Sequence, residues 1–381
     1  MTMSLPTFFA ESDQGIDSLH RCCSSQPTLT DYPNSATIDD KVLTYQGDRL
    51  NNVDKHLLKS EFAHCLNEGP GVFVIRDAYR DLSVIDRMTE LFMAIITEEQ
   101  ASGASQGDHF GTNERLWNAK QKTCIRDPEL FIAYHGNPLL ALVSQAWLGP
   151  HYQITSQVNN VKPGGQAQAV HRDYHLGFQS AATTAQFPAH AQVMSQFLTL
   201  QGAIAHSDMP LESGPTLLLP YSQQFAPGYL AYRRPEFADY FRQHHVQIPF
   251  QKGDMVFFNP ALMHGAGTND SDKDRVANLL QISSVFGRTM ESIDSHAMIA
   301  AVYPTLQDRQ SVGALTECLR DDIIAAVADG YAFPTNLDSD PPTGGNAPTT
   351  DEVLMRQALT DQCSLNHLEA GLLARKTRRQ P

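Results

Sequence analysis

The chain has 381 residues, of which 41% are hydrophobic, and a formal net charge of -14 at pH 7. This length and composition can fill one large domain or two ordinary ones, and they exclude a chain that is disordered throughout. The negative charge argues against nucleic-acid and anionic-membrane partners. No apolar run approaches the roughly 18 residues of a membrane span. The one basic cluster, residues 375–379, is expected to be a solvated tail.

The cysteine pattern and the N-terminal segment bear on location. None of the six cysteines has C-x-x-C spacing, so reduced thiols are the simplest interpretation. The first thirty residues have neither a basic region nor a continuous apolar stretch, so no signal peptide is expected. We predict a cytoplasmic protein. The cysteines are Cys22, Cys23, Cys65, Cys124, Cys318 and Cys363.

The first half of the chain is predicted to be largely helical. Residues 1–40 are polar and aperiodic, which predicts a flexible N-terminal arm. Apolar positions at helical spacing predict helices over 54–67 and 82–99, and the β-rich run 72–75 between them predicts a strand. A further helix is expected over 138–148.

A polar, glycine-containing stretch, residues 100–127, interrupts these helices and carries Trp117. Long irregular segments inside domains are often lids or binding loops. An exposed connector anchored by one tryptophan is the alternative interpretation.

From residue 152 the pattern changes to short β-like runs separated by Gly, Pro and Asn. Such runs without intervening helices indicate an antiparallel sandwich or barrel, and we expect a mainly β fold with flanking helices. After residue 286 helical patterns return, and a linker over 337–350 precedes one amphipathic helix over 351–374. The predicted strands are 153–161, 168–175, 193–206, 216–220, 246–249, 255–259 and 277–286.

A candidate metal site is predicted from His171, Asp173 and His264. The first two are two positions apart on a predicted strand, so both side chains would point to one face. Two imidazoles and one carboxylate are the ligands of a facial Fe(II) site. An H-x-D pair alone arises easily by chance, but His264 follows at the end of a strand-like run and Arg275 begins the next one.

Three ordered motifs resemble those of the phytanoyl-CoA dioxygenase family. Residues 171–175 look like its H-x-D-x-H motif, and residues 252–265 look like its second metal-ligand motif. Between them, residues 212–222 resemble its hairpin, with Tyr221 where the family has Gly and Gln223 where it has His. The resemblance extends over about 155–290 and more loosely over 60–100.

This resemblance implies a double-stranded β-helix (a cupin-like jelly roll) in which His171, Asp173 and His264 hold Fe(II). It also implies 2-oxoglutarate and O2 as co-substrates, which would occupy the open metal positions. We expect a single jelly-roll oxygenase domain over 41–335, with an N-terminal helical layer and a β core at about 150–290. The remaining 336–381 would be the linker and C-terminal helix.

The resemblance also implies residues that bind the co-substrate. Arg275 would pair with the far carboxylate of 2-oxoglutarate, since a guanidinium does this bidentately; a surface salt bridge is the alternative. Lys162 aligns with a family lysine that contacts the co-substrate. Gln201 stands where the family has an aromatic residue, and Ala266 where it can have Ser, so the secondary hydrogen bonds are expected to differ.

Substrate contacts are expected around the metal site and from the segments 100–127 and 176–190. His175 has no place among three ligands, so we expect it next to the ligands or against the substrate, with simple packing as the alternative. The candidate substrate-binding residues are His175, Arg172, Tyr174, Phe178 and Trp117.

The predicted function is hydroxylation, or another oxidation, of an unactivated C–H bond in a small or medium organic molecule. An amino-acid-like compound or a natural-product intermediate is favoured, and the retained Asp173 argues against halogenation. The alternatives are a hydroxylase of acyl-CoA or lipid substrates, a cupin-type metal enzyme without redox chemistry, and a scaffold protein without activity. The sequence does not indicate an oligomeric state.

Overall fold

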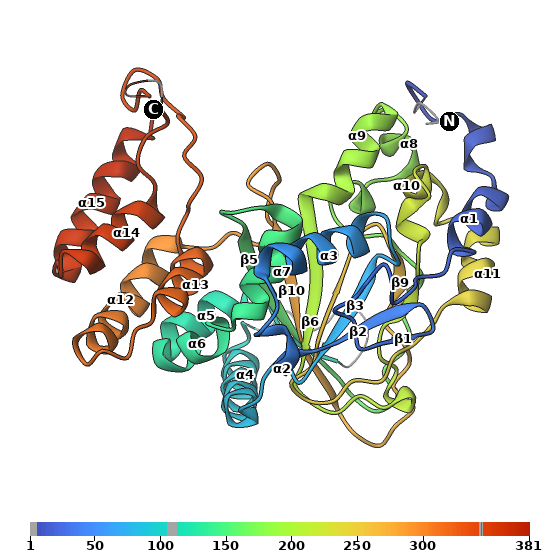
Figure 1. Ribbon diagram of the computed structural model, residues 1–381, viewed down its shortest axis with the longest axis horizontal. Helices are drawn as coiled ribbons and strands as arrows, with labels where there is room; N and C mark the ends of the chain where they lie inside the picture. Colours follow the sequence, from blue (N-terminus) through green and yellow to red (C-terminus); the bar gives the residue numbers. More distant parts are fainter. Residues whose placement is uncertain (1–5, 105–112, 343, 345) are drawn as a thin grey trace.

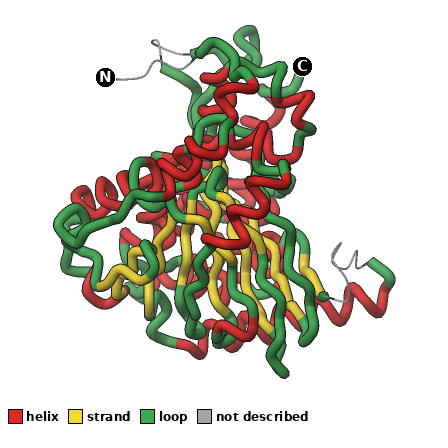
Figure 2. Tube along the Cα trace, turned by 90° about the vertical axis from the view of Figure 1, so that its right-hand side faces the viewer, coloured by secondary structure: helices red, strands yellow, loops and turns green. Residues whose placement is uncertain are grey.

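An eight-stranded mixed sheet forms the centre of the computed structural model, which describes residues 6–104, 113–342, 344 and 346–381. Its strands run side by side in the order β1-β2-β3-β8-β6-β10-β5-β4 (Figures 1 and 2). Only β2 and β3 pair in parallel; the other neighbours are antiparallel. The strands are β1 Thr37–Asp39, β2 Val42–Gln46, β3 Val72–Arg76, β4 Glu114–Leu116, β5 Gln153–Val161, β6 Thr199–Ala205, β8 Met255–Phe258 and β10 Arg275–Ser283.

A second, small sheet faces the large one. It consists of β7 (Leu217–Leu219) and β9 (Met263–Gly265), which pair antiparallel. Isolated bridges extend it on both sides, from His171 to His264 and from Leu218 to Val246. Apolar side chains of both sheets meet between them, including Val256, Phe258 and Leu218.

The opposite face of the large sheet is covered by helices α3 (Lys55–Asn67), α4 (Leu82–Ser102) and α7 (Pro138–Leu148). Apolar residues at helical spacing turn one stripe of each helix towards the strands, which buries it from water. The Asp54 carboxylate caps the start of α3 by accepting from the backbone of His56 and Leu57. This helix layer and the sheet share the largest apolar core of the described residues.

Three helices cover the small sheet from outside: α1 (Ile16–Cys23), α10 (Gly228–Ala231) and α11 (Pro235–His244). Leu19 of α1 is fully buried among them. The predicted flexible arm is therefore wrong for this segment, because a helix of it packs into a core.

The C-terminal helices pack together with two helices from residues 119–135 in a second core at one end of the molecule (Figure 1). Residues 351–378 make two helices and not the single one predicted, since the chain breaks at Ser364, which caps the second. The members are α5 Ala119–Arg126, α6 Pro128–His135, α12 Ser295–Ser311, α13 Glu317–Val327, α14 Asp351–Thr360 and α15 Leu365–Arg378.

The basic cluster at the C-terminus is not a solvated tail. Arg375 is buried, and it forms ion pairs with Asp351 at 2.9 Å and Asp329 at 3.1 Å. Arg378 pairs with Asp340. These cations are therefore neutralised within the protein and hold α15 in place.

Most predicted elements are confirmed, including the three helices, the strand at 72–75, and the strands at 153–161 and 255–259. Helices nevertheless contain more residues than strands, so "mainly β" describes the central sheets and not the whole chain. The remaining helical segments are short. They are α2 Gly47–Leu50, α8 Ala181–Thr184, α9 Ala189–Met194 and the 3-10 turns Glu11–Gln14, His175–Phe178, Ser195–Leu198, Leu211–Ser213 and Ser222–Gln224.

The predicted loop at 100–127 is wrong in its second half, where β4 and α5 form. Residues 105–112 of that prediction lie outside the described residues. The predicted strand at 193–206 begins only at Thr199, because α9 and a 3-10 turn precede it, and the one at 246–249 is reduced to a single bridge at Val246.

The segment 168–175 is not a strand, although it was predicted as one. Only His171 forms a bridge, after which Tyr174 and His175 adopt the left-handed region with φ of 59° and 46°. Such angles are unfavourable for residues with a Cβ. The chain therefore turns sharply directly after Asp173, and a 3-10 turn begins at His175.

Among the described residues, no helix is both long enough and apolar enough to cross a membrane.

Replacing Arg375 by Met should lower the free energy of unfolding by about 3–5 kcal/mol, because the buried Asp351 would lose its partner. Urea unfolding of the full chain, followed by circular dichroism, measures this. The matched control is Arg356→Met in α14, whose ion pair with Asp321 is 38% and 46% exposed; its loss should stay below about 1 kcal/mol. Equal losses would contradict the structural role of Arg375.

At His175, glycine should be more stable than alanine by about 1 kcal/mol, since only glycine tolerates a left-handed φ without strain. Both variants lose the imidazole, so their difference isolates the backbone. At the exposed helical position Arg87 of α4, the same comparison should have the opposite sign. Thermal unfolding of the four variants checks this, and alanine being the more stable residue at both positions would refute it.

Candidate functional site

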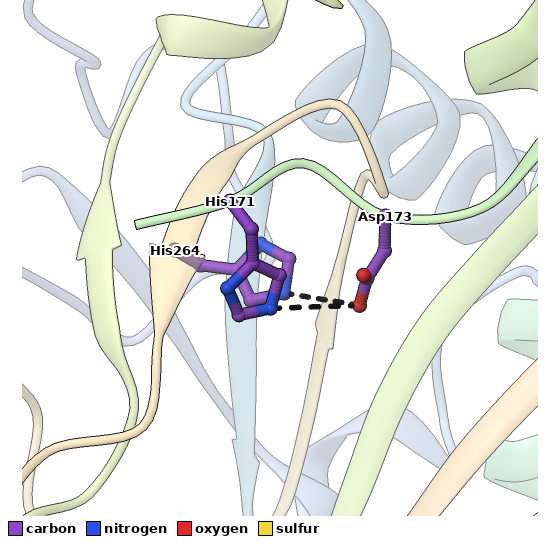
Figure 3. A group of neighbouring side chains, drawn as sticks. All are labelled: His171, Asp173 and His264. Carbon is purple, nitrogen blue, oxygen red and sulfur yellow. Dashed lines mark ion pairs between the residues drawn. The ribbon is translucent and has the colours of Figure 1, made fainter. Parts of the chain in front are cut away.

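His171, Asp173 and His264 come together at the edge of the small sheet (Figure 3). Their potential ligand atoms all lie within 4.8 Å of one another. The Asp173 Oδ2 is 3.4 Å from His264 Nε2 and 3.8 Å from His171 Nε2. The predicted triad is thus brought together, although the predicted strand that was to align it does not exist.

Backbone pairing positions these side chains. His171 and His264 exchange backbone hydrogen bonds at 2.9 and 3.1 Å, and the Asp173 amide donates to the Pro260 carbonyl at 2.9 Å. The ligand segment is therefore fixed to β9 and to the turn before it. This pairing, rather than strand alternation, makes both imidazoles and the carboxylate converge.

Each imidazole has its Nδ1 near a backbone carbonyl, at 2.8 Å from Ala169 for His171 and at 2.8 Å from Leu262 for His264. A neutral imidazole with its proton on Nδ1 leaves the Nε2 lone pair free. Because both Nε2 atoms face Asp173, each ring can offer that lone pair to a metal ion, with the carbonyl fixing its orientation.

The protonation states suit a metal site. Burial, followed by the charge of His264, lowers the pKa of His171, which favours the neutral ring. Burial acts to raise the pKa of Asp173, but hydrogen bonding and charge from His264, the charge of His171 and a bond from Gln201 lower it overall. Neutral imidazoles and a carboxylate are the forms that bind metal.

Gln201 lies beneath the carboxylate, on β6. Its amide donates to Asp173 Oδ2 at 2.6 Å and lies 3.5 Å from the Tyr174 hydroxyl. Burial, then the charge of Asp173, raises the pKa of Tyr174 well above its usual value. Gln201, predicted to bind the co-substrate, therefore contacts a predicted metal ligand, and Tyr174 lies next to both.

Arg275 begins β10 and is only 7% exposed. Its Nη1 donates to the carbonyls of Ser213 at 2.7 Å and Gly267 at 3.2 Å, and no described carboxylate pairs with it. Burial lowers the pKa of Arg275 to about 10. A buried guanidinium of this kind favours an anionic partner, and the alternative of a surface salt bridge finds no support.

Lys162 has partners of its own. Its ammonium lies 2.8 Å from Glu114 and 2.8 Å from Asp274, and the side chain is 33% exposed. These two carboxylates neutralise the charge, so the ammonium does not require the co-substrate that was predicted to bind it.

Arg172 points away from the triad, although it lies between two of its members. The fully buried guanidinium donates to the Ser222 carbonyl and lies over the Tyr229 ring at 5.5 Å, while its Nε has no partner in the part of the chain that the structure describes. A Cβ on Gly228 would overlap it, at 1.9 Å from Cζ. Its contacts thus join the ligand segment to α10 and the hairpin, which differs from the predicted substrate contact.

The other three candidates have partners outside the triad. The His175 Nε2 lies 3.3 Å from the Thr199 hydroxyl. Phe178 is 58% exposed and packs edge-on against Tyr174. Trp117 is half-buried, with Arg115 over its ring at 4.9 Å.

Sequence reasoning missed three residues near the triad. Phe258 on β8 packs edge-on against His264 with ring centroids 4.8 Å apart. Gln281 on β10 lies directly opposite Gln201 and hydrogen-bonds Tyr174, and the charge of Glu291 acts on the same hydroxyl. Side chains alternate along a strand, so the sequence places Gln281 on the same face of β10 as Arg275. Nothing in the sequence, however, indicates that Gln281 pairs with Gln201.

Among solved structures, the chain resembles enzymes from nogalamycin biosynthesis. The α-ketoglutarate-dependent epimerase SnoN is 15% identical, with a TM-score of 0.40 and coverage of 60% of this chain and 84% of that one. SnoN in complex with Fe3+, α-ketoglutarate and nogalamycin RO is 16% identical, with a TM-score of 0.42 and coverage of 60% of this chain and 84% of that one. The α-ketoglutarate-dependent carbocyclase SnoK is 20% identical, with a TM-score of 0.41 and coverage of 61% of this chain and 85% of that one.

No curated protein matches the sequence. The family model of phytanoyl-CoA dioxygenase (PhyH), in contrast, matches residues 68–277, which include the triad, the hairpin and Arg275. Together with the His-Asp-His group, this match supports Fe(II) and 2-oxoglutarate as the metal and co-substrate of an Fe(II)/2-oxoglutarate-dependent enzyme. Since the match spans more than half of the chain, the protein belongs to the phytanoyl-CoA dioxygenase (PhyH) family.

Proposed function

We propose that the protein is a 2-oxoglutarate-dependent oxygenase that hydroxylates an unactivated C–H bond of a small or medium organic molecule. The observation that carries the proposal is the convergence of His171, Asp173 and His264 within 4.8 Å, with both Nε2 atoms facing the carboxylate. An amino-acid-like compound or a natural-product intermediate is the proposed substrate, in a cytoplasmic setting that six unpaired cysteines support.

The proposed architecture is a jelly roll made by the two facing sheets. The small sheet supports this architecture. Across it, His171, β9, β7 and Val246 lie side by side in this order, over one face of the large sheet. We further propose that 41–335 act as one catalytic domain, with the linker and helices α14 and α15 of 336–381 as an addition to it.

In this proposal His171, Asp173 and His264 would hold the metal ion. When bound, Fe(II) with 2-oxoglutarate and O2 supplies an oxidant strong enough to take hydrogen from an unactivated C–H bond. The Ala169 and Leu262 carbonyls accept from the two Nδ1 atoms and so hold both rings with Nε2 turned towards Asp173. The Gln201 amide holds the carboxylate in place.

Arg275 is proposed to bind the far carboxylate of 2-oxoglutarate. Its support is burial without a described carboxylate partner, which is costly unless an anion compensates for it. A cupin-type enzyme without redox chemistry would have no use for such a group. A scaffold without activity would need neither it nor the triad.

Asp173→Ala should weaken Fe(II) binding by at least about 100-fold, because losing even an outer partner of a ligand costs 10–100-fold. Anaerobic calorimetric titration of the metal-free protein measures this. The control is Asp272→Ala, at an exposed carboxylate. Undiminished binding in the Asp173 variant would overturn the proposed metal site.

Arg275→Met should raise the KM for 2-oxoglutarate by about 100-fold, as expected when a buried charge pair loses one partner. Succinate formation measures it. Lys162→Met serves as the comparison and should raise KM far less, because Glu114 and Asp274 already neutralise that ammonium. An equal rise would show that Lys162 binds the co-substrate too, and no rise for Arg275 would refute its proposed role.

A further inference from the structure

Gln201 and Gln281 form a polar wall next to Asp173, and each carries a buried amide oxygen without a partner among the described residues. The two residues are directly opposite each other on β6 and β10, so their side chains share one face of the large sheet. That face is the one turned towards the small sheet, because Ala203 and Ala277 on it pack into the core between the sheets.

Both amides use their N–H groups within the protein. Gln201 donates to Asp173, and Gln281 hydrogen-bonds the Tyr174 hydroxyl. Their carbonyl oxygens, however, have no partner among the described residues. The side chains are only 7% and 5% exposed, so water does not readily compensate. A buried acceptor left unpaired is costly and calls for an explanation.

Glu291, in the segment between β10 and α12, does not belong to this set. Its carboxylate accepts from the Asn118 amide at 2.5 Å and has further hydrogen bonds from Gln157 and the Ser156 backbone. Two unpaired oxygens, those of Gln201 and Gln281, therefore lie next to the tyrosine that follows Asp173.

Resting on the proposed function, we propose that the substrate presents N–H or O–H donors, from an ammonium or hydroxyl groups, to the oxygens of Gln201 and Gln281. Donors bound there would position a neighbouring C–H bond beside Asp173. A hydrocarbon chain without such donors would leave both oxygens buried and unpaired. The wall thus disfavours a lipid whose bound part carries no N–H or O–H group.

The experiment measures succinate formed by the full chain with Fe(II) and 2-oxoglutarate, in the presence of matched pairs of compounds. Each pair compares a primary ammonium with its trimethylammonium analogue, or an alcohol with its methyl ether, on the same linear or cyclic framework. We expect the donor-bearing members to stimulate succinate formation. Their methylated partners should stimulate it at least about tenfold less. The two kinds of pair distinguish an ammonium from a hydroxyl.

Two variants link the effect to the wall. Gln281→Met keeps the side-chain volume and removes the unpaired oxygen, so it should reduce the discrimination to less than about twofold. Asn278→Leu is the matched control: three positions earlier on β10, its amide donates to Tyr134 and its oxygen is also unpaired, but it faces the helices. It should leave the discrimination unchanged.

The proposal is overturned if methylated members stimulate as well as their partners, if no donor-bearing compound stimulates, or if Gln281→Met discriminates as Asn278→Leu does. The comparison within pairs uses the unaltered protein, so it holds even if a variant fails to fold. A chain that forms no succinate and binds no 2-oxoglutarate contradicts the proposed function instead.

Discussion

The pairing of His171 with His264 is the contact on which the site depends. One bridge between two short segments fixes both imidazoles, and the next residues fix the carboxylate through the Pro260 carbonyl. Two strained backbone angles follow at Tyr174 and His175. Strain of this kind persists only where surrounding contacts impose it, and here it directs the chain away immediately after Asp173.

Three buried arginines differ in the partners that compensate their positive charge. Arg375 is fully compensated by two aspartates and joins the C-terminal helices. Arg172 is satisfied in part by a carbonyl and an aromatic ring, and it fastens the ligand segment to the layer outside the small sheet. Arg275 has only carbonyls. Neither Arg172 nor Arg275 thus has a carboxylate partner among the described residues, and Arg275 is the one proposed to bind the far carboxylate of 2-oxoglutarate.

The inner face of the large sheet combines two properties that oppose each other. Ala203, Ala277 and Phe258 make it part of a packed core, whereas Gln201 and Gln281 introduce amide oxygens that no described residue satisfies. Each such oxygen costs on the order of 1–3 kcal/mol of stability. Retaining polar groups of this kind beside a metal site is consistent with a trade of stability for substrate recognition.

The sequence by itself determined the triad, Arg275, the family and most regular elements, because ligand chemistry and hydrophobic periodicity are local properties. The prediction of a strand over 168–175 was wrong. The H-x-D spacing suggests a strand, and only the contacts with β9 and Pro260 reveal the turn. The sequence also could not foresee the partners of Lys162 or the pairing of Gln201 with Gln281. Those depend on strand register and on residues far apart in the chain, which only the tertiary structure decides.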